Sequence, residues 1–181
     1  MALTATLYTF DVALSDVDRG VYEQLSIKAA RHPSESEEYL LTRVLAYCLE
    51  YTEGIAFSKG GISDADEPAI TVKDLTGAWK SWIEVGAPDS ARLHFASKAC
   101  KRVALYTHKE ARLLLRAYEG QRIHRAEHVE VYAMDPELLA ALIGHLDRRT
   151  KWTLSVTDGQ LFMDVAGASY SGSVQRVALP G

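Results

Sequence analysis

A glutamate in the middle of an apolar segment is the residue best placed to do chemistry in this sequence. The segment, SWIEVGAPD at residues 81–89, predicts a short buried strand that the Gly-Ala-Pro run ends. Side chains alternate along a strand, so Glu84 shares a face with Trp82, and that face is also predicted to be buried. A buried carboxylate is costly unless it pairs with a cation or coordinates a metal ion. Arg43 and Arg92 are available for pairing, and the alternative is a ligand in a cleft.

Further carboxylates are predicted to converge on Glu84. The acidic loop SDADEP places Asp64, Asp66 and Glu67 before the strands that lead to it. Glu38 precedes the apolar positions of a predicted helix by three and seven residues, which assigns it to the buried side of that helix. Carboxylates gathered in this way predict a site for Mg²⁺ or Mn²⁺, which prefer oxygen ligands and offset the repulsion of like charges. Taken alone, the loop is better explained as a solvated acidic segment.

Periodicity and turn residues divide the chain into alternating helices and strands. The clearest helix is 32–51, where Ser34 or Ser36 caps the start and Glu35 belongs either to the carboxylate site or only to the helix start. The other predicted helices are 89–102, 109–120 and 135–146. The predicted strands are 2–16, 21–31, 54–58, 69–74, 79–86, 103–108, 128–134, the hairpin 151–166 and a last strand in 169–179. The interleaved order predicts an α/β protein with a mixed β-sheet flanked by helices.

Length and composition predict a single globular domain over residues 1–181, because 48% of the residues are hydrophobic and 24% are charged. The net charge of −4 argues against a protein that coats nucleic acid non-specifically, but it allows a local basic cleft. No apolar run reaches the ~18 residues of a membrane span, and no signal peptide is apparent. Cys48 and Cys100, both in helical patterns, are interpreted as reduced core residues. We expect a cytoplasmic monomer without membrane contact.

Two segments that look like catalytic motifs lack the context such motifs need. HRAEH at residues 124–128 matches the H-x-x-E-H pattern of inverted zinc proteases, which functions only on a helix. Here the segment follows Gly120 and runs into a predicted strand, which favours surface residues at a loop-to-strand junction. GASYSG at residues 167–172 misses the G-x-S-x-G spacing and no helix follows it.

Three motifs together resemble the YaeQ family of small bacterial proteins. They are ARHPSESEE at 30–38, DADEPAI at 64–70 and WIEVGAPD at 82–89, and the similarity extends over essentially the whole chain. The resemblance implies a fold related to the PD-(D/E)XK nuclease superfamily. The expected architecture is a restriction-endonuclease-like core, ordered helix, three strands, helix and strand, with an N-terminal β-hairpin and C-terminal strands. The helices and strands predicted from periodicity and turn residues follow the same order between residues 34 and 107.

The resemblance also implies roles for individual residues. In the nuclease superfamily an aspartate near the start of one strand and a glutamate on the next hold the metal, and a glutamate on the first helix supports the site. Carried over by motif, Asp66 and Glu84 are the metal ligands and Glu38 is the helix residue. Asp74 is a weaker candidate for the aspartate, because it falls late in its strand.

The lysine of the superfamily motif is missing here. The E-x-K triplet reads Glu-Val-Gly at 84–86, so an amine that activates the attacking water has to come from elsewhere. Lys59, before the acidic loop, and Lys98, on the following helix, are the candidates. Lys80 shares the face of Glu84 but lies four residues away, roughly 13 Å along a strand, which is too far. The missing lysine puts catalysis in doubt more than it does metal binding.

Basic residues on the predicted helix 89–102 are the candidate surface for a nucleic-acid backbone. The spacing of the last three would group them on one helical face, and the alternative is an ordinary solvated helix surface. The four residues are Arg92, Lys98, Lys101 and Arg102.

Two hypotheses of different classes follow. One is a Mg²⁺- or Mn²⁺-dependent phosphodiester hydrolase, a nuclease, in which the cation polarises the phosphate and activates a bound water. The other is a non-catalytic module that binds nucleic acid or a protein on a nuclease-like scaffold. An amine that points into the carboxylate cluster favours the first hypothesis. An arginine clamped on Glu84 favours the second.

Overall fold

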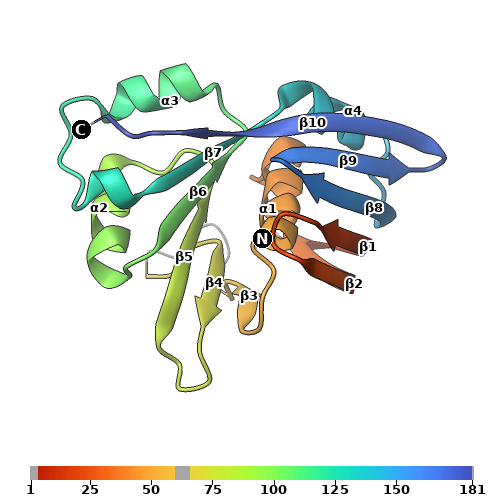
Figure 1. Ribbon diagram of the computed structural model, residues 1–181, viewed down its shortest axis with the longest axis horizontal. Helices are drawn as coiled ribbons and strands as arrows, with labels where there is room; N and C mark the ends of the chain where they lie inside the picture. Colours follow the sequence, from red (N-terminus) through yellow and green to blue (C-terminus); the bar gives the residue numbers. More distant parts are fainter. Residues whose placement is uncertain (1–3, 60–65, 181) are drawn as a thin grey trace. The chain divides into compact units, whose positions relative to one another are not determined.

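The computed structural model describes residues 4–59 and 66–180 (Figure 1). The chain folds into two compact units, each built from two separate stretches. The first unit contains the chain up to Leu49 and Met134–Gln175, and the second contains Glu50–Ala133 and the chain from Arg176 onward. Whether these two units together form the single domain predicted for residues 1–181 stays a prediction. No helix in the described part of the chain is long and apolar enough to span a membrane.

The first unit is a sheet of long strands with two helices. Its strand order is β2-β1-β8-β9-β10, with β1 parallel to β8 and the other neighbours antiparallel. The strands are β1 (Thr6–Asp16), β2 (Val21–Arg31), β8 (Arg149–Thr157), β9 (Gln160–Val165) and β10 (Ala168–Val177). The helices, which contact each other, are α1 (Glu37–Leu49) and α4 (Pro136–Ile143). The predicted N-terminal and C-terminal hairpins are confirmed.

Alternation along the strands buries one face of this sheet. Burial in β1, β8 and β9 falls on every second residue, as expected for a sheet with one covered face. The largest fully buried side chains include Phe10 and Trp152, whose ring centroids lie 5.0 Å apart. Both helix starts carry the predicted caps, because Ser36 accepts a hydrogen bond from the Tyr39 N–H and Asp135 accepts from residues 137 and 138.

The β8–β9 turn is held by a side chain from the β1–β2 turn. Asp158 and Gly159 adopt φ values of +52° and +72°, as the predicted two-residue turn requires. The two carboxylate oxygens of Asp18 accept the N–H groups of Asp158 at 2.7 Å and Gly159 at 3.0 Å. These bonds lower the pKa of Asp18, because both stabilise its ionised form.

The second unit carries the strands around the opening motif. Its strand order is β7-β6-β5-β4-β3, in which β3, β4 and β5 form an antiparallel meander and β5, β6 and β7 run parallel. The strands are β3 (Ile55–Phe57), β4 (Ile70–Lys73), β5 (Trp79–Val85), β6 (Val103–Thr107) and β7 (Glu130–Met134). The helices are α2 (Ser90–Ala99) and α3 (Ala111–Tyr118), with a short 3-10 helix η2 (Ala126–His128).

The mixed α/β class and the order of elements are confirmed. Along the chain α1 is followed by β3, β4 and β5, then by α2 and β6, as predicted. Trp82 of β5 and Leu93 of α2 belong to one buried cluster with Leu105 and Val131 of the next two strands. This cluster fixes α2 against the face of β5 that carries Trp82.

The predicted helix 89–102 extends too far. The helix ends at Ala99, and Cys100 is already extended, with φ −142° and ψ 140°. Cys100 is buried in the same cluster as Trp82, so the chain has to leave the helix there to begin β6 at Val103. The residues between Cys100 and β6 therefore do not belong to a helical face.

Candidate functional site

Glu84 is a buried carboxylate paired with an arginine. Only 5% of its side chain is exposed. The Trp82 indole nitrogen donates to Oε1 at 2.7 Å, and the Nε of Arg92 donates to both carboxylate oxygens, at 2.9 and 3.0 Å. Glu84 thus pairs with Arg92, one of the two arginines that the sequence offers for it, and its roles as metal ligand and catalytic residue stay predictions.

The start of α2 places Arg92 for this contact. Asp89 caps the helix by accepting the backbone N–H of Arg92 at 2.8 Å, which puts the arginine in the first turn beside β5. The Nη2 of Arg92 donates to the carbonyl oxygen of Glu67 at 2.6 Å. One guanidinium thus ties β5, α2 and the end of the acidic loop together.

Negative charge near Glu84 also acts on Tyr118 of α3. The Tyr118 hydroxyl donates to the carbonyl oxygen of Pro88 at 2.6 Å. Burial raises the pKa of Tyr118, and the carboxylates of Asp89 and Glu84 raise it further. Tyr118 therefore remains a neutral hydrogen-bond donor that fixes the turn after β5.

Two acidic residues of the loop, Asp66 and Glu67, lie within the described part of the chain. Asp66 is exposed, and Asp64 lies outside the described residues. The Glu67 carboxylate pairs with the ammonium group of Lys73 at 3.4 Å. The roles of Asp66 as metal ligand and catalytic residue stay predictions.

Asp74, the weaker candidate for the metal-binding aspartate, accepts hydrogen bonds within the turn that follows it. Its Oδ1 accepts hydrogen bonds from the Thr76 hydroxyl, the Thr76 N–H and the Ala78 N–H. These bonds, with that of the Thr76 hydroxyl as the largest cause, lower the pKa of Asp74. The arrangement is an Asx turn that joins β4 to β5.

Glu38 is exposed, so its predicted place on the buried side of the helix is wrong. The helix begins at Glu37, and burial sets in only from Leu40 onward, on nearly every side of the helix. Glu38 therefore lies in a first turn that emerges from the core, where periodicity no longer decides burial. Glu35 is the buried glutamate instead, and it accepts from Arg43 at 3.2 Å within the first unit.

Gly86, at the position expected from the resemblance to hold the motif lysine, has a backbone suited to glycine. Gly86 is buried and adopts φ +96°, a region that residues with a Cβ rarely enter. Its N–H donates to the carbonyl oxygen of Tyr106 at 2.9 Å, which fixes that backbone at the end of β5. Lys59 and Lys98, the two lysines predicted to replace it, are both exposed.

The predicted basic face of helix 89–102 does not form, because two of its four residues are paired with glutamates of the same chain. Arg92 is committed to Glu84, and Arg102 lies outside the helix and pairs with Glu50 at 2.8 Å and Glu130 at 3.0 Å. Tyrosine hydroxyls on β6 and β7 donate to the same two glutamates. Lys98 and Lys101 are exposed, but Lys101 follows the end of α2. A single helical face of three basic residues is therefore wrong.

A different basic group, not predicted from the sequence, forms beside α2. We call it the His94 cluster; its members are His94, Lys98, Arg122 and His124. The backbone N–H of His124 donates to Nδ1 of His94 at 2.9 Å, and the two rings lie edge to face with centroids 6.3 Å apart. Desolvation lowers the pKa of His94, and the charges of Lys98, Arg122 and His124 lower it further. His94 therefore presents a neutral ring with its proton on Nε2.

An exposed aromatic ring accompanies the His94 cluster. Phe95 of α2 is 49% exposed, and its ring and that of Trp82 form an edge-to-face pair with centroids 5.8 Å apart. Lys98 lies one helical turn further along from both His94 and Phe95. Sequence spacing could not reveal this cluster, because Arg122 and His124 reach α2 only through the packing of the loop after α3.

Among the described residues, the donors around Glu84 do not fit a divalent cation. Both of its carboxylate oxygens accept hydrogen bonds from the Arg92 guanidinium, which carries the charge that a metal ion would bring. Within residues 4–59 and 66–180, no three His, Cys, Asp or Glu side chains are grouped so that they could hold a metal ion.

The HRAEH segment at residues 124–128 lies outside any α-helix, in the turn that contains η2.

Comparison with known proteins identifies the family. Residues 1–173 match the family model described as YaeQ protein. "Uncharacterized protein YaeQ" from Escherichia coli (strain K12) is 31% identical over 165 residues, 90% of each chain, and that from Salmonella typhi is 30% identical over 168 residues, 92% of each.

Two crystal structures are similar over nearly the whole chain. The YaeQ protein from Pseudomonas syringae is 34% identical with a TM-score of 0.84 and covers 96% of both chains. The YaeQ protein from Xanthomonas axonopodis pv. citri is 27% identical with a TM-score of 0.86, covering 98% of this chain and 100% of the other. The resemblance inferred from the three sequence motifs is therefore confirmed, and this chain belongs to the YaeQ family.

Proposed function

We propose that this protein is a non-catalytic nucleic-acid-binding module on a restriction-endonuclease-like core related to the PD-(D/E)XK superfamily. The observation that carries the proposal is the Arg92–Glu84 pair. A nuclease of this type needs the carboxylate of Glu84 open to a cation, whereas here a guanidinium contacts both of its oxygens. The pair makes Glu84 a structural group that joins β5 to α2.

The competing nuclease hypothesis needs Mg²⁺ or Mn²⁺ held by Asp66 and Glu84, supported by Glu38, and an amine from Lys59 or Lys98 in place of the motif lysine. The surroundings of Glu84 and Gly86 argue against it. Arg92 neutralises Glu84, and the φ of +96° at Gly86 disfavours any side chain at the lysine position. We derive no catalytic step through a metal ion from these residues.

The His94 cluster supports nucleic acid as the partner. Lys98 and Arg122 supply positive charge on a chain whose net charge is −4, so the surface is locally basic on an acidic protein. Phe95 adds an exposed ring of the kind on which unpaired bases stack. Cations beside an exposed aromatic ring favour a single strand over a duplex, because only unpaired bases offer their faces.

The test separates binding from cleavage. A fluorescein-labelled oligothymidylate and a labelled RNA of the same length are titrated with the protein, and their anisotropy is followed at several salt concentrations. The same oligonucleotides are then incubated with excess Mg²⁺ or Mn²⁺ and examined for cleavage. The proposal expects salt-dependent binding and intact oligonucleotides. Metal-dependent cleavage that Glu84→Ala abolishes would restore the nuclease hypothesis.

A pair of charge variants localises the binding. Lys98→Ala combined with Arg122→Ala removes two positive charges from the His94 cluster and should lower the salt slope by about 0.7 for each phosphate that is no longer neutralised. Lys28→Ala combined with Lys151→Ala removes the same charge from exposed positions on β2 and β8 and serves as the control. An equal decrease in both variants would overturn the assignment to the His94 cluster and show that the binding follows net charge alone.

A further inference from the structure

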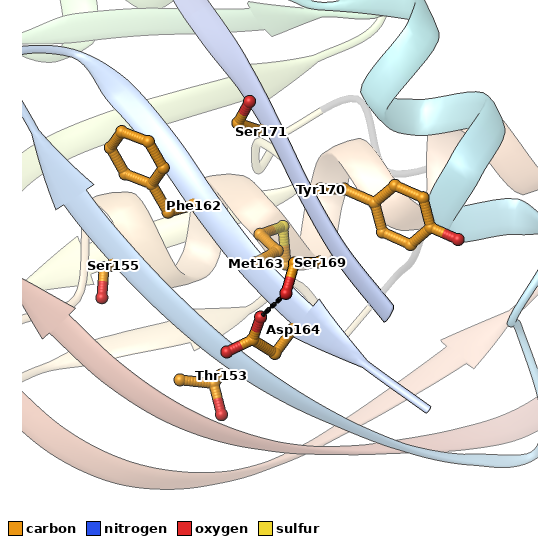
Figure 2. A pocket seen from close by; sticks show the side chains of 8 residues that line it. All are labelled: Thr153, Ser155, Phe162, Met163, Asp164, Ser169, Tyr170 and Ser171. Atoms are coloured by element: carbon orange, nitrogen blue, oxygen red, sulfur yellow. Dashed lines mark hydrogen bonds between the residues drawn. The ribbon is translucent and has the colours of Figure 1, made fainter. Parts of the chain in front are cut away.

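The exposed face of β8, β9 and β10 contains a hollow of about 390 Å³ that the function proposed above does not use. Figure 2 shows small hydroxyl side chains, two aromatic rings, a methionine and one carboxylate around it. The volume lies in the range of small-molecule sites. The side chains that carry the argument are Thr153, Ser155, Phe162, Asp164, Ser169 and Ser171.

Strand register arranges these side chains in two rows. Asp164 of β9 stands between Thr153 of β8 and Ser169 of β10. Two residues along β9, Phe162 stands between Ser155 and Ser171. The rows are roughly 7 Å apart and each spans about 10 Å across three strands, given ordinary strand dimensions. A carboxylate row thus lies beside an aromatic row on one open surface.

Hydrogen bonding holds the polar row in place. The Ser169 hydroxyl donates to Asp164 Oδ1 at 2.5 Å, and the second carboxylate oxygen lies on the Thr153 side (Figure 2). The ring of Tyr170 points away from the hollow, where its hydroxyl bonds Nε2 of His145 at 2.7 Å. Phe162, which is 49% exposed, is therefore the aromatic ring offered to a ligand.

We propose that this hollow binds a neutral carbohydrate, with one face of a sugar ring on Phe162 and its hydroxyl groups on Asp164 and the flanking serines and threonine. Sugar hydroxyls both donate and accept hydrogen bonds, as serine and threonine hydroxyls do, and a carboxylate adds a strong acceptor. The C–H groups of a sugar ring form an apolar face that suits an aromatic ring. The small neighbours of Phe162 leave that ring accessible from solvent.

The charge of the lining residues favours a neutral sugar over an anionic nucleic acid or a cationic side chain. The described residues that line the hollow include no lysine or arginine, and the carboxylate of Asp164 repels phosphate groups. The lining of the hollow therefore disfavours nucleic acid, whereas the His94 cluster carries positive charge. A cationic side chain of a partner would satisfy Asp164 but would leave the four hydroxyl groups without a role.

Saturation-transfer NMR tests the proposal with the intact chain. Cellobiose, maltose and N,N′-diacetylchitobiose are each added at millimolar concentration, and transfer of saturation from the protein to the sugar ring protons is measured. We expect transfer to at least one of them. Phe162→Ala should weaken the binding about tenfold, which is the usual effect of removing one stacked aromatic ring. Asp164→Asn should weaken it as well, because a charged acceptor becomes a neutral amide.

Phe95→Ala is the matched control, because Phe95 and Phe162 are both 49% exposed and lie in different units. It should leave sugar binding unchanged and reduce oligonucleotide binding instead. Absence of transfer to all three sugars, or equal transfer to the wild type and Phe162→Ala, would overturn the proposal. Binding of N-acetylarginine amide in place of the sugars would also overturn it and assign the hollow to a cationic partner. Neither result bears on the oligonucleotide titrations, so the two proposals fail separately.

Discussion

Arg92 holds Glu84 through a single nitrogen atom, because its Nε donates to both carboxylate oxygens while its Nη2 reaches the carbonyl of Glu67. Removing the guanidinium leaves a carboxylate inside the core. We expect Arg92→Ala to lower the free energy of unfolding by about 2–3 kcal/mol, measured by urea denaturation at pH 7. The decrease stays below that of a fully buried pair because 24% of the Arg92 side chain is exposed.

The control for this prediction is Arg112→Ala. Its pair with Glu110 is exposed, with 74% and 58% of the two side chains accessible, so the decrease should stay below about 0.5 kcal/mol. An Arg92→Ala protein no less stable than the Arg112→Ala protein would show that the Glu84 pair contributes nothing to folding.

Substitutions at Gly86 test whether a lysine can be accommodated at the motif position. Because φ is +96°, Gly86→Ala should lower the free energy of unfolding by about 1–3 kcal/mol. Gly77→Ala has nearly the same φ, +86°, with open space around the added Cβ, and should cost about 1–2 kcal/mol. Gly86→Lys should be destabilised and should not cleave oligonucleotides with Mn²⁺. A stable Gly86→Lys protein with cleavage activity would contradict the non-catalytic proposal.

Asp18 should make the stability of the first unit depend on pH in the acid range. Its folded-state pKa is lowered, first by the Gly159 N–H and then by that of Asp158. The stabilisation is therefore complete above the ordinary value of 3.8 and is lost as the pH falls through the lower folded pKa. Thermal unfolding from pH 6 down to pH 2 should show Asp18→Ala below the wild type at pH 6 and the two converging in acid.

Glu23→Ala, at an exposed carboxylate of β2, is the comparison for Asp18→Ala. Its unfolding curve should run parallel to that of the wild type over the same range. A constant gap between Asp18→Ala and the wild type would assign the effect to packing of the turn and not to the carboxylate charge.

Oligonucleotide binding should strengthen as His94 becomes protonated. Its pKa lies below the ordinary 6.5, by desolvation first and then by the charges of Lys98, Arg122 and His124. The ring is therefore neutral at pH 7 and gains a positive charge only as the pH falls through this lowered pKa. Anisotropy titrations at pH 7.5 and 5.5 should show tighter binding at the lower pH, and His94→Gln should reduce that gain. An identical gain in His94→Gln would assign the effect to His124.

Arg102→Gln should destabilise the protein without weakening oligonucleotide binding. The arginine is held by Glu50 and Glu130, so its charge is already neutralised within the second unit. The free energy of unfolding should fall by about 2 kcal/mol, because two partly buried carboxylates are deprived of a charged donor. Anisotropy measured well below the unfolding temperature should match the wild type. Weaker oligonucleotide binding by this folded variant would show that Arg102 contributes to the nucleic-acid-binding surface, as the sequence predicted.

Most of the strands could be predicted from the sequence. A sheet with only one buried face requires apolar and polar residues to alternate along each strand, and this alternation is visible in a single sequence. The β1–β2 and β8–β9 hairpins follow directly from it, as does the Asp158-Gly159 turn. The end of α2 was missed because Cys100 and Lys101 have ordinary helical neighbours, and only the burial of Cys100 turns the chain there.

For the site around Glu84, the sequence predicted two alternatives, an ion pair with an arginine or a ligand in a cleft, without deciding between them. The sequence marks Glu84 as a buried carboxylate and offers Arg43 and Arg92 as partners, but it does not reveal which arginine faces which glutamate. Arg43 pairs with Glu35 in the first unit and Arg92 with Glu84 in the second. The His94 cluster left no local signal, since its members meet through tertiary packing.

The division of the chain between its two units has a consequence for its synthesis. β1 lies beside β8, and Asp18 reaches Gly159 across 141 residues of sequence, most of which build the second unit. At the usual 5–20 residues per second, the ribosome delivers the partner of β1 roughly 7–28 s after β1 itself. For that time the backbone N–H and C=O groups on the β8 side of β1 lack the strand that pairs with them in the folded protein. An unpaired strand edge of this length is a template for pairing with another chain, so the delay exposes the nascent protein to edge-to-edge aggregation.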